Sequence, residues 1–376
     1  PNGVGAGTSS LTITNEWQRF ELTGDNGIAL QGLWIDDITS DGLYIWGAQV
    51  EIGSQATTYI YTEDRLNVPR IDYTGGGCPH ILAEPQRINI CLQSQTINDA
   101  AWVKSVSGTG ITPVVTANNV ISPDGTQNAE KVVFDLNGGT SSSDFSYLYQ
   151  TYTQTADTYS LSCYLKGASG GENIFLDFDT QNTNTVTLTA DWVRYTFTKA
   201  VTNTGSRIIR IGVRGGVTSS DNPTVYMWGC QLEVGSYATS YIPTVAASVT
   251  RNKDVFTRTG IADLINDSEG VLYVEAKTTY DSSKSRRISL SDGTIGNRVS
   301  LEFDDSVENK IKAFISLNGT NQILEYTAPN LAQFNKIAIK YKVNDFAVWF
   351  NGTEVVTDTS GDVPTGMTRI GFDGGS

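Results

Sequence analysis

Apolar residues alternate with polar residues over short runs along the chain, and this pattern limits its fold more than any other feature of the sequence. In "TYSLSCYLKG" the alternation places Leu161, Cys163 and Leu165 on one side. Successive side chains of a β-strand point to opposite faces, so a period of two predicts strands with one buried face. A helical turn is expected only near "IADLIND". We therefore predict an all-β chain of sheets stacked face to face.

A motif of 20 residues occurs twice, at residues 43–62 and 225–244, and its two copies agree at 12 of 20 positions. The agreement extends upstream, where residues 14–23 and 189–198 share a tryptophan, an arginine and an aromatic residue. Internal similarity of this kind indicates a repeated structural module. We interpret the 20-residue motif as the closing strand of a sandwich module.

The alternation within the second copy of this motif predicts which of its side chains face the core. The predicted inward residues are Tyr226, Trp228, Cys230 and Leu232. The predicted outward residues are Met227, Gly229, Gln231 and Glu233. The first copy repeats this register, which places both Trp46 and Trp228 in the interior.

The spacing of the repeats divides the chain into four predicted parts. Residues 92–245 contain an entire module, whereas residues 1–62 contain the C-terminal part of one. Residues 63–91 contain three prolines and three successive glycines, which is typical of an extended connector. Residues 246–376 read as antiparallel strands of a second type of sandwich, with Asn-Gly hairpin turns, and they end before an expected closing strand. The chain is thus predicted to be a series of tandem β-sandwiches joined by an extended connector.

The charge and composition of the chain restrict its partners. Its net charge of −14, from 26 Lys and Arg against 40 Asp and Glu, argues against nucleic-acid binding, which needs a basic surface. No apolar run approaches the roughly 18 residues of a membrane span, and no signal segment opens the chain. We expect neither nucleic-acid binding nor membrane insertion. The first residue is Pro1, which suggests a piece or a processed form of something longer.

The cysteines and the single histidine, His80, do not suggest a zinc site. The cysteines are Cys78, Cys91, Cys163 and Cys230, and no pair has Cys-x-x-Cys spacing. We interpret them as small buried thiols and leave their oxidation state open. A structural Ca²⁺ held by Asp177, Asp179 and loop carbonyls also stays open, although the spacing of an EF-hand fails after these residues. No other cofactor is expected.

Three stretches of the sequence have the features of one group of proteins. They are the "W-G-[AC]-Q-[VL]-E-x-G-S-x-A-T-x-Y-I" ending of both motif copies, the connector "PRIDYTGGGCPHILAEPQRIN" (69–89), and the hairpin "NDFAVWFNG" (344–352). Together they resemble bacteriophage tail-fibre and adhesin proteins. The resemblance implies carbohydrate-binding-module-like jelly rolls at 1–62 and 92–245 and a concanavalin-A/laminin-G-like sandwich at 246–376. It also implies host-surface attachment by a fibre that is commonly trimeric.

The candidate site residues lie together on the predicted polar faces of neighbouring strands. They are Tyr164, Asp177, Arg210, Arg214, Gln231 and Glu233. Such a set suits sugar recognition, in which aromatic rings contact the apolar side of a sugar while carboxylate, amide and guanidinium groups bind its hydroxyls. The alternative is that Asp177 or Glu233 pairs with an arginine across strands and satisfies a half-buried sheet face. The exposure of Trp102, Tyr147 and Tyr149 is left open.

No catalytic residue is predicted. Residues 167–171, "GASGG", satisfy the Gly-x-Ser-x-Gly pattern of hydrolases, but that chemistry needs a strand-to-helix turn and a histidine base. Ser169 is expected in a loop, and the one histidine lies in the connector. Asp177 and Asp179 share a predicted strand face, which is weak support for glycoside cleavage.

These observations predict a non-catalytic, extracellular segment of a virion tail fibre that attaches to the host surface through glycan-binding sandwiches. The expected partners are a host-cell glycan, other fibre proteins and further copies of the chain, in a trimer. Two alternatives remain. In the first, the modules are the ancillary carbohydrate-binding region of a polysaccharide-degrading enzyme. In the second, they are a purely structural fibre spacer.

Overall fold

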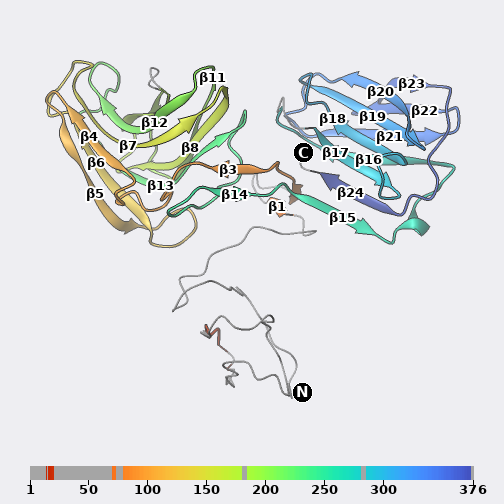
Figure 1. Ribbon diagram of the computed structural model, residues 1–376, viewed down its shortest axis with the longest axis horizontal. Helices are drawn as coiled ribbons and strands as arrows, with labels where there is room; N and C mark the ends of the chain where they lie inside the picture. The colour runs from red at the N-terminus through yellow and green to blue at the C-terminus, as the bar shows by residue number, and fades with distance from the viewer. Residues whose placement is uncertain are drawn as a thin grey trace. The chain divides into compact units, whose positions relative to one another are not determined.

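The computed structural model describes residues 14, 16–20, 70–72, 79–179, 184–280 and 285–373 (Figure 1). The chain divides into two compact units, Pro1–Glu63 and Asp64–Ser376. The first copy of the repeated motif, with Trp46, lies outside the described residues, as does Cys78. The partial module at 1–62 therefore stays a prediction, and so do the other domain boundaries.

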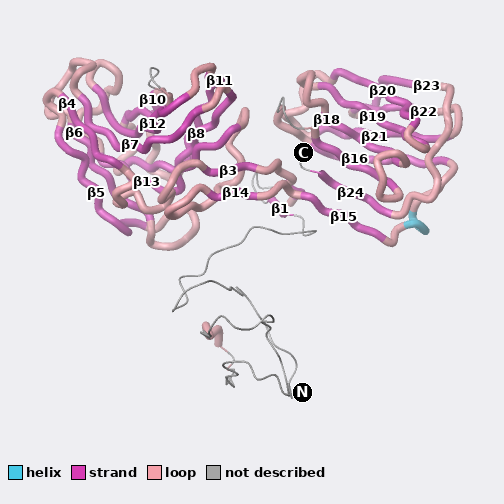
Figure 2. The backbone as a smooth tube through the Cα atoms, viewed as in Figure 1, coloured by secondary structure: helices cyan, strands magenta, loops and turns pink. Residues whose placement is uncertain are grey.

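The described part of the chain is all-β, which confirms the predicted fold class (Figure 2). Its helical content is one 3₁₀ turn, η1 (Ala262–Leu264), in the "IADLIND" stretch where a turn was expected. No helix among the described residues is long and apolar enough to span a membrane.

The first sandwich contains two five-stranded antiparallel sheets. In spatial order, the sheet that we call the β7 sheet contains β4 (Val103–Ser107), β7 (Phe145–Gln154), β12 (Gly205–Arg214), β9 (Asn173–Phe178) and β10 (Thr185–Thr187). The sheet that we call the β13 sheet contains β5 (Ile111–Val120), β6 (Ala129–Asp135), β13 (Thr224–Val234), β8 (Asp157–Gly167) and β11 (Val193–Val201). From β7 onward the chain passes repeatedly from one sheet to the other, as in a jelly roll.

The core of the first sandwich follows the predicted alternation on most strands. Leu161, Cys163 and Leu165 of β8 lie in one buried cluster with every second residue of β9 and β12. Those residues are Ile174, Leu176, Phe178, Ile209, Ile211 and Val213. Burial of one face of each sheet accounts for the choice of register, since a slip by one residue would expose the whole set.

Strand β13 departs from the predicted register. Its pairing with β8 shifts between Trp228 and Gln231, where Gly229 has a φ of 65°. This irregularity inserts extra backbone, so Val225 and Met227 face the core before it, and Cys230 and Leu232 face the core after it. The prediction that Met227 points outward, and Trp228 toward the core, is therefore wrong. Trp228 is buried instead on the opposite side of the sheet.

The chain that precedes the first sandwich is ordered by contacts with it. Strand β3 (Arg87–Asn89) pairs with β14 (Val249–Arg251), and β1 (Arg70–Asp72) pairs with β2 (His80–Leu82). Asn89 is fully buried, and its amide donates hydrogen bonds to the carbonyls of Cys230 and Ile242, at 3.1 and 2.8 Å. Residues predicted to belong to the connector thus take part in the packing of the sandwich.

The described cysteines are buried free thiols, as predicted. Cys91, Cys163 and Cys230 lie in the core of the first sandwich, and none of them forms a disulfide. Burial together with the neighbouring thiols of Cys163 and Cys91 raises the pKa of the Cys230 thiol. These thiols therefore pack as small apolar groups.

The second sandwich contains a six-stranded and a four-stranded sheet. The six-stranded sheet contains, in spatial order, β15 (Val255–Thr259), β24 (Arg369–Asp373), β17 (Arg286–Ser291), β18 (Arg298–Phe303), β19 (Lys310–Leu317) and β20 (Thr320–Thr327). The four-stranded sheet contains β16 (Glu269–Ala276), β21 (Asn335–Lys342), β22 (Phe346–Phe350) and β23 (Thr353–Asp358). Asn-Gly pairs at 318–319 and 351–352 have positive φ at both residues and join consecutive strands, which confirms the predicted hairpin turns.

Candidate functional site

A row of aromatic side chains follows the outer side of β7. Leu148 and Tyr152 face the core, so Phe145, Tyr147 and Tyr149 project to the other side of the strand. The ring centroids of Phe145 and Tyr147 are 4.6 Å apart and stacked, and those of Tyr147 and Tyr149 are 6.2 Å apart, edge to face. This spacing makes one continuous aromatic surface along the strand.

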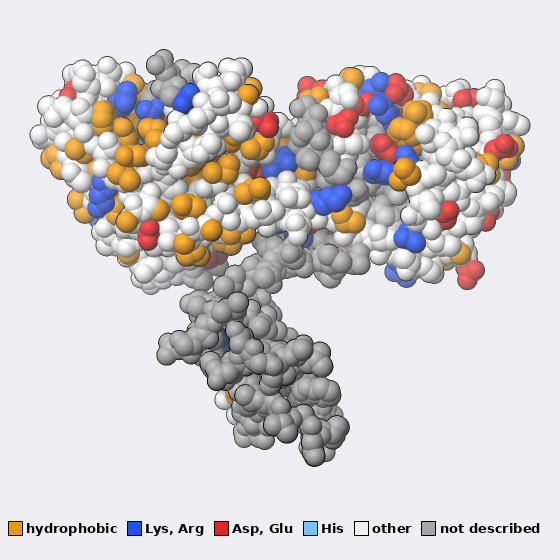
Figure 3. Space-filling view, in the orientation of Figure 1, with side chains coloured by type: hydrophobic (Ala, Val, Ile, Leu, Met, Phe, Trp, Pro, Cys, Tyr) orange, Lys and Arg blue, Asp and Glu red, His pale blue; other side chains and the backbone are white. Residues whose placement is uncertain are grey.

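The neighbouring strands add charged groups to this surface. In the antiparallel register Tyr149 lies opposite Arg210, and Phe145 lies opposite Arg214. Arg210 lies in turn opposite Asp177 of β9. We call the surface formed by Phe145, Tyr147, Tyr149, Asp177, Arg210 and Arg214 the aromatic–arginine face. Figure 3 shows hydrophobic and basic side chains next to each other where Figure 1 draws β7 and β12.

A glycine leaves room beside the central aromatic residue of this face, Tyr147. Gly212 lies opposite Tyr147, and a Cβ at Gly212 would be 2.4 Å from both the Tyr147 Cβ and the Ser146 carbonyl oxygen. On its far side Gly212 is opposite Phe175, whose ring contacts that of Tyr147 edge to face at 6.0 Å. The absence of a side chain at position 212 therefore makes room for Tyr147 in this place.

Asp177 and Arg210 form a buried ion pair across β9 and β12. The guanidinium donates two hydrogen bonds to the carboxylate, Nε to Oδ1 at 2.9 Å and Nη2 to Oδ2 at 3.1 Å. Burial raises the pKa of Asp177 to about 6, against the opposing charges of Arg210, Arg214 and Lys199. Asp177 is 0% exposed, so the pairing that was the alternative to sugar contact is present.

Arg214 differs from Arg210 in its partners. Its guanidinium carbon lies 5.3 Å from the centroid of the Phe145 ring, within range of a cation–π interaction. Its Nε is buried and has no hydrogen-bond partner among the described residues. Of the predicted site residues, Arg214 thus offers donor groups that the protein itself does not use.

Asp179 follows β9 and pairs with two cations. Its carboxylate lies 3.1 Å from Lys199 Nζ and 3.0 Å from Arg207 Nε. Burial acts to raise the pKa of Asp179, but its hydrogen bonds to Lys199 and Arg207 and the charge of Lys199 hold it below the usual range. Among the residues that the structure describes, no group of three or more His, Cys, Asp or Glu is placed to hold a metal ion. The two carboxylates considered for calcium are thus engaged by side-chain cations.

The other three predicted site residues lie on the outer side of the β13 sheet, away from Asp177, Arg210 and Arg214. Tyr164 packs edge to face on Trp228 at 5.4 Å, and Arg194 lies over its ring at 5.5 Å. Gln231 and Glu233 are fully buried. The prediction that all six residues share one exposed surface is therefore wrong, because their strands belong to two different sheets.

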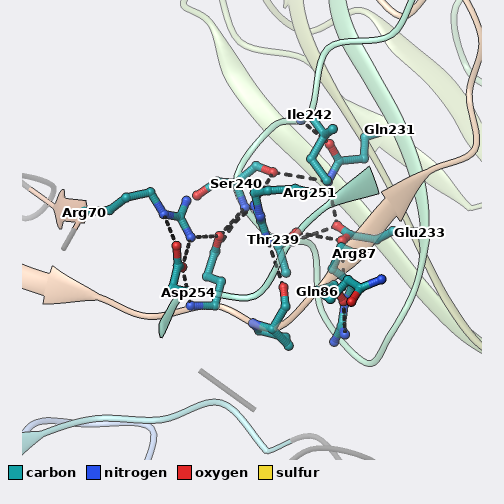
Figure 4. Close-up of polar contacts among 12 residues, drawn as sticks. Arg70, Gln86, Arg87, Gln231, Glu233, Thr239, Ser240, Ile242, Arg251 and Asp254 are labelled. Carbon is teal, nitrogen blue, oxygen red and sulfur yellow. Dashed lines mark hydrogen bonds and ion pairs between the residues drawn. The ribbon is translucent and has the colours of Figure 1, made fainter. Parts of the chain in front are cut away.

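The segment after β13 covers Gln231 and Glu233 (Figure 4). The Glu233 carboxylate accepts hydrogen bonds from the backbone N–H and the hydroxyl of Thr239, at 2.7 and 2.6 Å. The Gln231 side chain donates to Glu233 Oε1 at 2.7 Å and accepts from the backbone N–H of Ile242, also at 2.7 Å. Arg87 Nε lies 3.7 Å from the Glu233 carboxylate. These residues of the repeated motif therefore fasten the folded-back chain to the closing strand.

The same region holds the connector through a network of ion pairs (Figure 4). The Glu84 carboxylate lies 2.8 Å from both Arg70 Nη2 and Arg251 Nη1, and it accepts a hydrogen bond from the backbone N–H of Ser240 at 3.0 Å. Arg70 also pairs with Asp254. Burial opposes ionisation of Glu84, but Arg251 and Arg70 lower its pKa overall. This network is structural, since all its charges are matched within the protein.

Comparisons with known proteins give little further information. No protein-family model and no curated protein matches the chain. One similar solved structure, described as "CBM4 structure and function", is 19% identical with a TM-score of 0.24, and the match covers 39% of this chain and 84% of that one. Another is the N-terminal CBM22-1-CBM22-2 tandem domain from Paenibacillus barcinonensis Xyn10C, at 11% identity and a TM-score of 0.25, covering 72% and 84%. With TM-scores below 0.5, neither similarity establishes a fold or a ligand for this chain.

Some residues of the site were absent from the sequence prediction. Phe145 and Gly212 were not singled out, and Tyr147 and Tyr149 were left open. The signal was present in "FSYLYQTYT", where aromatic residues recur every second position opposite Leu148. Trp102, the other residue left open, is 3% exposed and lies in the core.

The expectation for Ser169 is confirmed. It lies in an exposed turn between β8 and β9, and its backbone N–H donates to the Glu172 carboxylate at 2.7 Å. A strand-to-helix turn, which a nucleophile elbow requires, is not found there.

The side chains of the aromatic–arginine face can recognise a ligand by stacking and by charge-assisted hydrogen bonds.

Proposed function

We propose that this chain is a non-catalytic segment of a virion tail fibre that attaches to a host-surface glycan through the aromatic–arginine face. The observation that carries the proposal is the row of Phe145, Tyr147 and Tyr149 beside Arg210 and Arg214. Aromatic rings stack on the apolar side of sugar rings, and guanidinium groups bind sugar oxygens. Both kinds of group occur together on one outer sheet face.

The fibre context rests on the resemblance of the closing-strand motif, the connector and the 344–352 hairpin to phage tail-fibre and adhesin proteins. The connector is also fixed to a distant part of the chain, because Glu84 and Asp254, 170 residues apart, are joined by a hydrogen bond and both pair with Arg70. A trimer, fibre-protein partners and an extracellular location on the virion belong to the same proposal.

One observation favours a second candidate, a structural fibre spacer. Asp177 and Arg210 satisfy each other, and Tyr147 is 8% exposed, so part of the aromatic–arginine face is closed by its own packing. A spacer needs a well-packed sheet but no ligand. Phe145, Tyr149 and Arg214 are more exposed than Tyr147. Substitution of these residues therefore distinguishes glycan binding from a structural role.

The test measures binding of the full chain to a glycan array and to host cells, with Tyr149→Ala as the site variant. The matched control is Tyr273→Ala, because Tyr273 is 57% exposed on the second sandwich. We expect the site variant to lose binding and the control to keep it. Absence of any bound glycan or cell would favour the spacer. Binding that both variants keep equally would show that the aromatic–arginine face is not the binding surface. Release of reducing ends from a polysaccharide would contradict a non-catalytic role.

A further inference from the structure

Arg214 carries a positive charge that no acidic side chain of the described residues neutralises in a direct ion pair. Other arginines of the first sandwich are used internally. Arg210 pairs with Asp177, Arg207 pairs with Asp179, and Arg194 donates to the carbonyl of Thr239 and the hydroxyl of Ser162. Arg214 has an aromatic neighbour, Phe145, and a buried Nε without a hydrogen-bond partner. The Nε of Arg194 is also buried without a partner, but its other two nitrogens donate to the protein, whereas no hydrogen bond from the Arg214 guanidinium is found among the described residues. A guanidinium that makes no hydrogen bond costs free energy, so its retention calls for an explanation.

The backbone of Arg214 is held by hydrogen bonds with the turn that follows it. The Arg214 N–H donates to the Thr218 hydroxyl at 3.1 Å, and that hydroxyl donates back to the Arg214 carbonyl at 3.1 Å. The backbone N–H groups of Val217 and Thr218 also donate to this carbonyl, at 3.2 and 2.9 Å. A fixed backbone and a ring beside the guanidinium reduce the entropy lost when a ligand binds.

The charge balance of the face restricts what it can accept. The Asp177 carboxylate pairs with Arg210 through both oxygens and is fully buried, so sugar hydroxyls do not reach it. Arg210 is likewise satisfied, which leaves one net positive charge, at Arg214, on a chain whose net charge is −14. A ligand that complements this face brings its own negative charge.

We infer, on the basis of the proposed glycan-binding function, that the aromatic–arginine face selects an acidic sugar whose anionic group is bound by Arg214 while Phe145 and Tyr149 contact its ring. The guanidinium fork matches a carboxylate, sulfate or phosphate group with two parallel hydrogen bonds. The neighbouring rings supply the apolar contact that a small inorganic anion would not use.

The experiment compares matched pairs of oligosaccharides that differ in charge alone. The probes are oligogalacturonides and their methyl esters, sialylated glycans and their desialylated forms, and sulfated glycans and their unsulfated forms. We expect the full chain to prefer the acidic member of at least one pair by about 10-fold or more at low salt, and to lose the preference as salt rises.

The variants are Arg214→Gln, Arg214→Lys and the control Arg258→Gln, which removes an exposed arginine of the second sandwich. We expect Arg214→Gln to weaken binding of the acidic probe by about 10- to 100-fold without affecting its neutral twin. Arg214→Lys keeps the charge but loses the fork, so its loss is intermediate. Arg258→Gln is expected to bind as the unmodified chain does. Thermal unfolding of each variant checks that it folds.

The outcomes separate this inference from the proposed function. Binding that is lost in Tyr149→Ala but is equal for acidic and neutral twins, or unchanged in Arg214→Gln, overturns the inference and keeps glycan binding. Absence of binding to both members of every pair overturns both.

Discussion

The two sheets of the first sandwich have outer faces of similar composition but different surroundings. The aromatic–arginine face of the β7 sheet has Phe145, Tyr147 and Tyr149 with Arg214 beside them. The outer face of the β13 sheet has an aromatic cluster of its own, in which Trp228 contacts both Tyr164 and Tyr241, with Arg194 nearby. The second cluster is covered by the chain that follows β13.

The difference shows that residue type alone does not identify a binding surface. On the β13 sheet, Arg194 donates to the carbonyl of Thr239 at 2.6 Å, and Glu233 accepts from the same residue's N–H. A later segment of the same chain therefore occupies the outer face of the β13 sheet. On the β7 sheet, the Arg214 guanidinium and the Tyr149 hydroxyl make no such hydrogen bond to another segment of the described residues.

Removal of the Glu233 carboxylate is expected to have the largest effect on stability. Glu233→Ala would remove the buried acceptor of the Thr239 N–H and hydroxyl and the carboxylate beside Arg87, which we expect to lower the free energy of unfolding by about 3–5 kcal/mol. The control Glu325→Ala removes a carboxylate that pairs with Lys310 at an exposed position, and its expected effect is below about 1 kcal/mol. Urea denaturation of both variants measures these changes in the free energy of unfolding. Equal effects would show that the covered face is not held by this carboxylate.

Burial of Asp177 in the β7 sheet is expected to make stability depend on pH. The pKa of Asp177 rises from 3.8 to about 6 on folding, so the folded state retains a proton that the unfolded state has lost between these values. Stability is therefore lost as pH rises through this range, by about 3 kcal/mol. Relative to Asp177→Asn, the unmodified chain should be more stable at pH 4 than at pH 7.

The positive charges of Arg210, Arg214 and Lys199 oppose this effect, because they favour the ionised form of Asp177. Parallel curves of unfolding free energy against pH for the two proteins would contradict the prediction.

A side chain at position 212 is expected to affect stability and binding together. The Cβ of Gly212→Ala would overlap the Ser146 carbonyl and Tyr147, at a cost of about 1–3 kcal/mol. Displacement of Tyr147 is expected to reduce glycan binding at temperatures where the variant is fully folded. The check combines thermal unfolding with titration of the glycan. Gly371→Ala is a control for the loss of a strand glycine, because a Cβ there would meet its nearest atoms at 3.6 and 3.7 Å, which is ordinary van der Waals contact.

The smallest expected effect comes from removal of a single hydroxyl on each face. The Tyr241 hydroxyl is hydrogen-bonded to that of Ser94 at 2.5 Å, so Tyr241→Phe should cost about 1 kcal/mol. The Tyr149 hydroxyl has no such bond among the described residues, so Tyr149→Phe should change stability by less than about 0.5 kcal/mol. Chemical denaturation of both variants measures the difference. A larger loss of stability for Tyr149→Phe than for Tyr241→Phe would contradict the contrast drawn between the aromatic–arginine face and the covered outer face of the β13 sheet.

The fold class, the core of β8, β9 and β12, and the two Asn-Gly turns were predictable because each follows from local patterns. The register of β13 was not, since one glycine with positive φ shifts the alternation within a single strand. Gly229 was the available signal, because a glycine inside a strand often marks such an irregularity.

The candidate site was predictable in part. Asp177, Arg210 and Arg214 were named correctly as neighbours away from the core, because the alternation places each of them opposite the apolar residues of its strand. The separation of Gln231 and Glu233 from them depends on which strands share a sheet, and their burial depends on where the next segment folds. Neither is encoded by the period of two, which describes each strand by itself.

The side chain of Asn89 joins positions that are made at very different times during synthesis of the chain. It bonds to Cys230 and Ile242, which lie 141 and 153 residues later, so this part of the sandwich cannot form on the ribosome until residue 242 has emerged. The same bonds also indicate where a fragment that contains this sandwich has to begin if it is to keep the contacts of its closing strand. A fragment cut at residue 92 would leave behind the asparagine that closes its own last strand, whereas one that begins before Arg87 would carry it along.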